Sequence, residues 1–231
     1  MTKIAVPIRS SSLKDLEEKA SSASDYDFLE IWLDKIDPNI SAKEIIKACG
    51  CGEKKLIITC KADWEKGEWK GTEEERVKRL EEFIKAGVKY IDVGMHTDRY
   101  LIWGLGKLRR KVKSGTQIIV SFHDFKETPT EKLLWQIIER GRFLKADIIK
   151  LAVKAKTIDD NLVLFRVLRR AERSAVKLIA HCMGEKGRIS RIVSPMLGSR
   201  IVYAATKKGY ITAPGQLLVE DYQALRNIIK L

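Results

Sequence analysis

The sequence predicts an α/β protein, a (β/α)8 TIM barrel in which residues 1–231 form a single domain of eight parallel strands and eight outer helices. Strand-like and helix-like segments alternate along the whole chain, in units of about 28 residues that suit this fold. No G-x-G-x-x-G turn follows an early strand, which disfavours the alternative, an open doubly wound sheet. Polar side chains gather late in several strands, where such barrels hold their active sites.

The first half of the chain contains four strand–helix units. Short apolar runs give the strands, serines can cap the helix that begins at residue 12, and Thr72 caps the third helix. Gly87 ends the third helix, because glycine readily takes the left-handed conformation at a helix end. In chain order, the predicted strands and helices cover residues 3–8, 12–23, 28–36, 41–49, 55–62, 72–86, 90–95 and 99–113.

The second half of the chain repeats this pattern. Asp159 and Asp160 lie in the first turn of the sixth predicted helix, where negative charge complements the helix dipole. A short seventh helix precedes the last strand. In chain order, the predicted strands and helices cover residues 117–125, 130–144, 147–153, 157–174, 177–183, 189–197, 201–205 and 219–229.

The sixth predicted strand carries a lysine in the middle of an apolar run. Ile149, Leu151 and Val153 share one face of this strand, and Lys150 lies on the other. A buried ammonium is costly, so the lysine either meets an anion or loses its proton. A neutral amine in a pocket attacks carbonyl groups and forms Schiff bases. The alternative is a structural lysine that extends its charged end to water.

The alternation of side chains along each strand places other polar residues in the barrel interior as well. If the apolar row of each strand faces the helices, the opposite row faces inward. The inward row contains, besides Lys150, the residues Glu30, Trp32, Asp34, Ile57, Thr59, Lys61, Ile119, Ser121, His123, Ile179, His181, Met183 and Tyr203. This is more polar surface than an ordinary core holds, and it favours an active site.

His123 stands on the strand before Lys150 and could move protons during amine chemistry. Glu65, just after the third strand, could orient the histidine and set its tautomer. Two plainer alternatives stay open at this point. His123 could be a structural histidine, and Glu65 could be a solvated loop carboxylate.

The composition indicates a soluble protein with a strongly basic surface. The formal net charge is +13 and the isoelectric point is about 9.5. The basic residues are spread over many segments, so attraction of a small anion is favoured over nucleic-acid binding. No apolar run approaches the roughly 20 residues of a membrane span, and the start lacks the features of a signal peptide. We therefore expect a cytoplasmic protein with no membrane partner.

The cysteines do not indicate a metal site. Cys49 and Cys51 form a pair that has no second ligand pair at zinc spacing. We expect reduced structural thiols here and at Cys60 and Cys182, and we expect no metal.

Several motifs resemble those of the type I 3-dehydroquinate dehydratases. Residues 121–129, SFHDFKETP, resemble the S-x-H-D-F-x-x-T-P signature of that family, and residues 147–152, DIIKLA, resemble its Schiff-base strand. Residues 183–191, 198–199 and 213–216 also match, so the resemblance covers nearly the whole chain. It implies a (β/α)8 barrel of the shikimate pathway that converts 3-dehydroquinate to 3-dehydroshikimate without a metal or organic cofactor. The family often forms dimers, so a homodimer is also implied.

The resemblance implies a role for each matching position. Lys150 would form an imine with the substrate ketone, His123 would act as general base and then acid, and Glu65 would assist it. Arg191 would hold the substrate carboxylate through its planar fork. The remaining substrate contacts implied by position are Glu30 for hydroxyl groups, Thr212 and Gln216 on a closing loop, and Met183 and Tyr203 as pocket walls.

Two positions depart from the family pattern. Trp32 and Lys61 stand where the family usually has arginines that help to bind substrate. The first departure removes a charge and adds bulk, and the second removes a bidentate fork. They predict weak substrate binding, and they leave open another Schiff-base lyase or aldolase with a different keto substrate, or a catalytically weakened barrel. An inactive barrel that binds nucleic acid is a further alternative.

Overall fold

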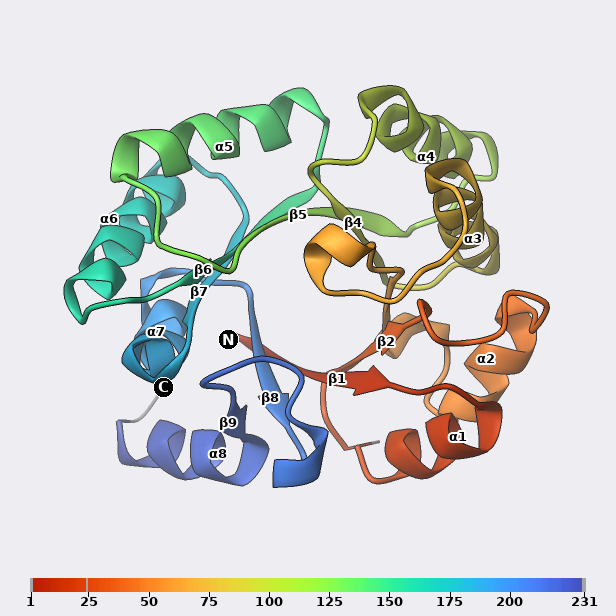
Figure 1. Cartoon of the computed structure of the whole chain (residues 1–231), viewed down its shortest axis with the longest axis horizontal. Helices are drawn as coiled ribbons and strands as arrows, with labels where there is room; N and C mark the ends of the chain where they lie inside the picture. The colour runs from red at the N-terminus through yellow and green to blue at the C-terminus, as the bar shows by residue number, and fades with distance from the viewer. Residues whose placement is uncertain (1, 24, 230–231) are drawn as a thin grey trace. The chain divides into compact units, whose positions relative to one another are not determined.

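A computed structural model describes residues 2–23 and 25–229 of the chain (Figure 1). Its contacts divide the chain into two compact units. One unit is Val6–Val120, and the other combines Met1–Ala5 with Ser121–Leu231. Two strands, β1 and β5, run from one unit into the other, and each unit repeats the order strand, then helix.

The unit Val6–Val120 contains four strand–helix repeats. Its elements are β1 (Lys3–Arg9), α1 (Leu13–Ser21), β2 (Phe28–Trp32), α2 (Ala42–Cys49), β3 (Leu56–Thr59), α3 (Glu73–Ala86), β4 (Tyr90–Gly94), α4 (Arg99–Lys111) and the first half of β5 (Gln117–Asp124), with short 3-10 turns at Glu53–Lys55 (η1) and Asp63–Glu65 (η2). β2 pairs with β3, and β3 with β4, all in parallel. Helices α1 and α2 pack together, as do α3 and α4 (Figure 1).

The predicted caps at Ser12, Thr72 and Gly87 are confirmed, whereas α1 ends at Ser21 rather than at residue 23 and α4 at Lys111 rather than at residue 113. Ser12 caps α1 by accepting a hydrogen bond from the backbone of Asp15. Ser41 and Thr72 each form a capping box with a glutamate three residues later, so side chains satisfy both the cap and the first turn. Gly87 closes α3 in the left-handed conformation, with φ of 77°.

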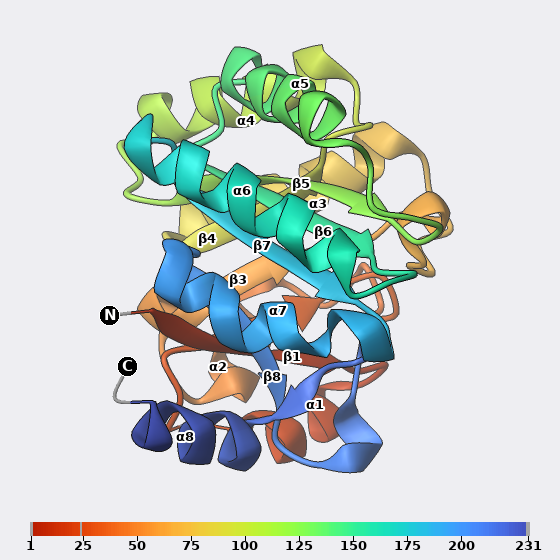
Figure 2. The same ribbon diagram turned by 90° about the vertical axis from the view of Figure 1, so that its left-hand side faces the viewer.

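The second unit carries the remaining elements. They are α5 (Glu131–Phe143), β6 (Ile148–Lys154), α6 (Asp159–Arg173), β7 (Leu178–Met183), η3 (Glu185–Gly187), α7 (Arg188–Val193), η4 (Ser194–Leu197), β8 (Ile201–Ala205), η5 (Lys208–Tyr210), β9 (Leu217–Leu218) and α8 (Val219–Ile228). β6 pairs with β7, β1 with β8, and β8 with β9, again all in parallel. Figure 2 shows α6 lying along β6 and β7.

Some predicted boundaries are wrong. β2 ends at Trp32 rather than at residue 36, because the chain turns after Leu33, where the Ile36 N–H donates to the Leu33 carbonyl. β3 likewise ends at Thr59 rather than at residue 62. The helix predicted over 189–197 divides into α7 and the 3-10 turn η4, which contains Pro195, a residue without a backbone N–H. The two-residue strand β9 was not predicted.

The structure describes all four cysteines of the chain. All four cysteine thiols are free, and burial raises the pKa of Cys49 and of Cys60 to about 12. These two thiols are therefore protonated and unreactive at neutral pH.

Among the helices that the structure describes, none combines the length and apolar character needed to cross a membrane.

Candidate active site

Lys150 lies in the middle of β6 and is only 4% exposed. Its neighbour Ile149 packs against α5 at Gly141, where a Cβ atom would come within 2.7 Å of the isoleucine side chain. The apolar row of β6 therefore faces the helices, and Lys150 points the other way, as strand parity predicted. Its Nζ lies 4.1 Å from the ring centroid of Tyr203, a buried residue of β8. The amine is held against an aromatic face with little access to water.

His181 is a neighbour of Lys150 that the sequence analysis placed inside the barrel but did not assign to the site. It lies on β7, is 8% exposed, and its ring centroid is 6.0 Å from that of Tyr203. Burial, followed by the positive charges of Arg191 and Lys150, holds the pKa of His181 well below its usual range. The imidazole is therefore neutral at pH 7. We call Lys150, His181, Arg191 and Tyr203 the lysine cluster.

Arg191 is 2% exposed and reaches the lysine cluster from the short helix α7. The start of α7 is held against β7 because the Ser190 hydroxyl accepts from the Cys182 backbone and donates to the Gly187 carbonyl, both at 2.7 Å. Burial lowers the pKa of Arg191 to about 10, so the guanidinium still carries its charge at neutral pH. Its Nε has no hydrogen-bond partner among the described residues. A buried, charged fork of this kind suits a carboxylate ligand.

The loop before α8 folds back onto the end of β7. The Pro214 carbonyl accepts from the Gly184 backbone at 3.0 Å and from Arg191 at 3.4 Å. The side-chain oxygen of Gln216, a buried residue, accepts from the backbone and hydroxyl of Thr212, at 2.9 and 3.3 Å. The structure therefore brings Thr212 and Gln216 together and connects their loop to Arg191 through Pro214.

Two more predicted residues lie at strand ends of the same unit. His123, near the end of β5, is partly exposed and stacks on Phe125 with ring centroids 5.9 Å apart. His123 is also among the groups that lower the pKa of His181, after burial, Arg191 and Lys150. Met183 ends β7 and is 3% exposed.

In the unit Val6–Val120, Lys61, Glu65 and Asp92 form a second buried group, which we call the carboxylate cluster. Lys61 Nζ donates to Glu65 Oε1 at 3.1 Å and to Asp92 Oδ1 at 3.2 Å, and the side chains are at most 4% exposed. The turn η2 returns Glu65 to Lys61, and Gly94 leaves room for it, since a Cβ there would meet Glu65 Oε2 at 2.6 Å. Asp92 was missed from the sequence, although it is a lone carboxylate in the apolar strand β4.

The free energy of unfolding of the chain should depend on the ammonium group of Lys61. Replacing Lys61 with methionine would remove the ammonium group that bonds to both buried carboxylates, at a cost of about 3–5 kcal/mol in the free energy of unfolding. Urea denaturation at pH 7 measures this, with Lys43→Met, at an exposed position of α2, as the control. Equal unfolding free energies for the two variants would show that the cluster is not a source of stability.

Glu30 and Trp32 lie on the same face of β2. Glu30 is 2% exposed, and its Oε2 accepts a hydrogen bond from the indole Nε1 of Trp32 at 2.9 Å. The guanidinium of Arg9, from the end of β1, lies 4.8 Å from the centroid of the indole ring. Asp34, predicted to face inward from the same strand, follows the strand end and accepts from the Glu68 backbone at 3.0 Å.

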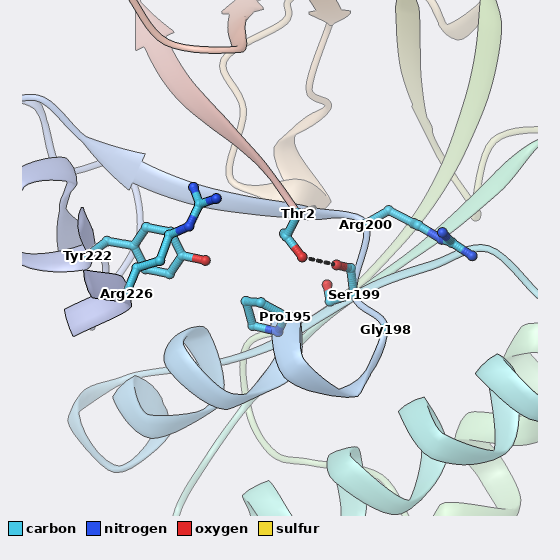
Figure 3. Close-up of a pocket in the computed structure, with 7 residues that line it drawn as sticks. All are labelled: Thr2, Pro195, Gly198, Ser199, Arg200, Tyr222 and Arg226. Atoms are coloured by element: carbon cyan, nitrogen blue, oxygen red, sulfur yellow. Dashed lines mark hydrogen bonds between the residues drawn. The ribbon is translucent and has the colours of Figure 1, made fainter. Parts of the chain in front are cut away.

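A cavity of about 260 Å³ lies in the unit that combines Met1–Ala5 with Ser121–Leu231 (Figure 3). It opens at the amino-terminal ends of β1 and β8, whereas Met183 and Arg191 lie at or beyond the carboxyl end of β7. Its lining residues are Thr2, Pro195, Gly198, Ser199, Arg200, Tyr222 and Arg226. None of the predicted site residues lines this cavity.

Comparison with known proteins identifies relatives along the whole chain. Residues 4–231 match the family model of the type I 3-dehydroquinase. A 3-dehydroquinate dehydratase from Methanococcus maripaludis is 32% identical over 229 residues, which are 99% of each chain.

Solved structures give the same result for the fold. The structure resembles a type I 3-dehydroquinate dehydratase from Clostridium difficile, carrying covalently modified comenic acid, with a TM-score of 0.88, 25% identity, and coverage of 99% of this chain and 92% of the other. It also resembles 3-dehydroquinate dehydratase from Geobacillus kaustophilus, with a TM-score of 0.89 and 24% identity. This likeness covers 100% of this chain and 91% of the other. These likenesses confirm the predicted α/β fold class, the (β/α)8 barrel.

Proposed function

Because the chain belongs to the type I 3-dehydroquinase family, we propose that it removes water from 3-dehydroquinate through an imine on Lys150. The chain is an enzyme, a hydro-lyase of the 3-dehydroquinate dehydratase type. The observation that carries the imine mechanism is the buried amine of Lys150, whose Nζ lies 4.1 Å from the ring centroid of Tyr203.

The imine accounts for the chemistry that a hydro-lyase must perform. The neutral amine of Lys150 adds to the substrate ketone, and loss of water gives a cationic iminium. This cation withdraws electrons, so that a base can remove a proton from the adjacent carbon. The resulting enamine expels the hydroxyl group one carbon further on, as water after it takes up a proton. Hydrolysis of the new imine consumes one water and releases 3-dehydroshikimate and the amine, so the net product is one water.

His123 is the residue we propose as the proton carrier. The alternative histidine, His181, is buried and has a lowered pKa, which makes it a weak base. His123 is more exposed and lies at the end of its strand. It would take the proton from carbon and return one to the leaving hydroxyl. The assisting role of Glu65 stays a prediction from the sequence.

Arg191 is proposed to bind the substrate carboxylate. The guanidinium is buried, charged at neutral pH, and has an Nε without a protein partner among the described residues. An anionic ligand would satisfy it with charge-assisted hydrogen bonds. Substrate contacts by Glu30, Lys61, Thr212, Gln216 and Met183 stay predictions.

The direct test is conversion of 3-dehydroquinate, followed by the absorbance of the conjugated enone product and by product analysis. We expect 3-dehydroshikimate and water. A different product from the same substrate would favour another Schiff-base reaction.

Activity should not depend on a metal ion. Within the described part of the chain, no group of three or more His, Cys, Asp or Glu side chains is placed to hold one. The iminium supplies the positive charge that a metal would otherwise provide. We expect dialysis against EDTA to leave turnover of 3-dehydroquinate unchanged. Loss of turnover that a divalent cation restores would contradict this.

A further inference from the structure

His181 is a buried histidine whose ring nitrogens make no hydrogen bond with the rest of the described chain. It lies in β7 and is 8% exposed. No hydrogen bond joins either ring nitrogen to another residue in the part of the chain that the structure describes. A neutral imidazole carries one donor and one acceptor, and burying either of them without a partner is unfavourable. An apolar side chain would fill this position at less cost, so the polar ring calls for a ligand.

The neighbours of His181 belong to the proposed imine site. Its register partner on β6 is Ala152, and Lys150 lies on the same face of β6, two residues earlier. The Lys150 Nζ lies 4.1 Å from the ring centroid of Tyr203, and the imidazole centroid of His181 lies 6.0 Å from the same point. The amine and the imidazole therefore share one aromatic neighbour, within a single unit of the chain.

A backbone contact connects the segment of His181 to that of Arg191. Cys182, the next residue on β7, donates its backbone N–H to the Ser190 hydroxyl at 2.7 Å, and Ser190 directly precedes Arg191 on α7. The Nε of this guanidinium also has no partner among the described residues. Two buried polar side chains from adjoining backbone segments thus lack protein partners. Such groups are rare in folded proteins, and a bound ligand is one explanation for them.

The charge of the imidazole decides which ligand group suits it. Burial, followed by the positive charges of Arg191 and Lys150, keeps the pKa of His181 well below its usual range, so the ring is neutral at pH 7. A carboxylate only accepts hydrogen bonds and gains from a positive charge, so it suits the guanidinium better than the neutral ring. A hydroxyl group both donates and accepts, so it can bond to either nitrogen of a neutral imidazole.

We propose that His181 is a substrate-binding residue, whose neutral imidazole forms a hydrogen bond with a hydroxyl group of 3-dehydroquinate while Lys150 holds the ketone carbon. This rests on the proposed function, which supplies a substrate with several hydroxyl groups. His181 thereby acts on substrate affinity, and the proton transfers stay with His123.

The first test measures binding without turnover, by calorimetry in a Lys150→Ala background. His181→Leu removes both hydrogen-bonding groups and should raise the dissociation constant for 3-dehydroquinate about tenfold. His181→Asn and His181→Gln place an amide near the positions of Nδ1 and Nε2, so one of them should bind within about threefold of the parent. The control is Ile179→Leu, on the same face of β7, which should change the dissociation constant by less than about twofold.

Two results of this experiment would overturn the proposal. An unchanged dissociation constant in His181→Leu would show that the imidazole makes no bond to the substrate. Equal losses of affinity in the leucine, asparagine and glutamine variants would show that the shape of the ring matters and its hydrogen bonds do not.

Urea denaturation without ligand provides a readout that a structural histidine would move in the opposite direction. An imidazole that bonds to no described residue adds no hydrogen bond to the folded chain, so His181→Leu should leave the urea midpoint equal to or above that of wild type. A lower midpoint together with unchanged binding would assign His181 to the structure and overturn the proposal.

Steady-state kinetics of the chain that keeps Lys150 separate this proposal from the proposed function. His181→Leu should raise KM for 3-dehydroquinate about tenfold and lower kcat by less than about tenfold. A normal KM in an active variant would overturn the role of His181 and leave the proposed function intact. A wild-type chain that binds 3-dehydroquinate but makes no product would overturn the proposed function instead, and a tenfold weaker dissociation constant in His181→Leu would still support the contact.

Discussion

Borohydride added to the chain together with 3-dehydroquinate is expected to label Lys150, with an added mass equal to that of the ligand less one oxygen atom. Imine formation removes one water, and hydride reduction followed by protonation adds two hydrogens, which leaves a stable secondary amine. Peptide mapping by mass spectrometry identifies the modified lysine. Lys150→Ala should show no such label and should lose turnover by about 10⁴-fold or more, as enzymes do when a covalent nucleophile is removed.

Lys61 provides a matched comparison within the same chain. Both lysines are at most 4% exposed, but they contact different kinds of side chain. Lys61 Nζ contacts two carboxylates, at 3.1 and 3.2 Å, which stabilise its ammonium form. Lys150 lies against an aromatic ring, and it acts on the buried imidazole of His181, as Arg191 does. Only Lys150 is therefore expected to react. A label on Lys61, or an active enzyme that cannot be trapped at all, would defeat the imine mechanism.

Local signals made most of the fold predictable from the sequence. Capping serines and threonines, and glycines at helix ends, satisfy backbone groups through their near neighbours, so they act within a few residues. Strand parity is equally local, which is why Ile149 and Lys150 could be assigned to opposite faces. The same reasoning would have found Asp92 and His181, because each is an ionisable residue in an otherwise apolar strand.

The features that were missed depend on turns and on contacts between strands. β2 was extended to residue 36 because Leu33 and Ile36 continue its apolar pattern, and both are in fact buried. The strand ends because the chain turns after Leu33, where the Ile36 N–H donates to the Leu33 carbonyl. The pairing of Lys61 with Glu65 needs the turn η2, and the stacking of Arg9 on Trp32 joins two strands. No periodicity in the sequence indicates either contact.

Replacing His123 with alanine is expected to lower kcat for 3-dehydroquinate by about 10²- to 10⁴-fold, the range for loss of a general acid–base. The iminium on Lys150 would still acidify the adjacent carbon, but no positioned group would take its proton or protonate the leaving hydroxyl. Slow labelling by borohydride should therefore persist in this variant, because imine formation precedes the proton transfer.

The other two histidines decide whether this effect is specific. His96→Ala, at an exposed position, should leave kcat unchanged. His181→Asn should lower kcat by less than about tenfold, because a buried imidazole whose pKa lies well below its usual range is a poor proton acceptor. The pH profile adds a second readout, since a group with the pKa of His181 would lose its proton well below pH 6.5 and could not produce a transition near neutrality. If His181→Asn were as damaging as His123→Ala and also removed a transition near neutrality, the proton carrier would be His181 and the proposed roles would have to be exchanged.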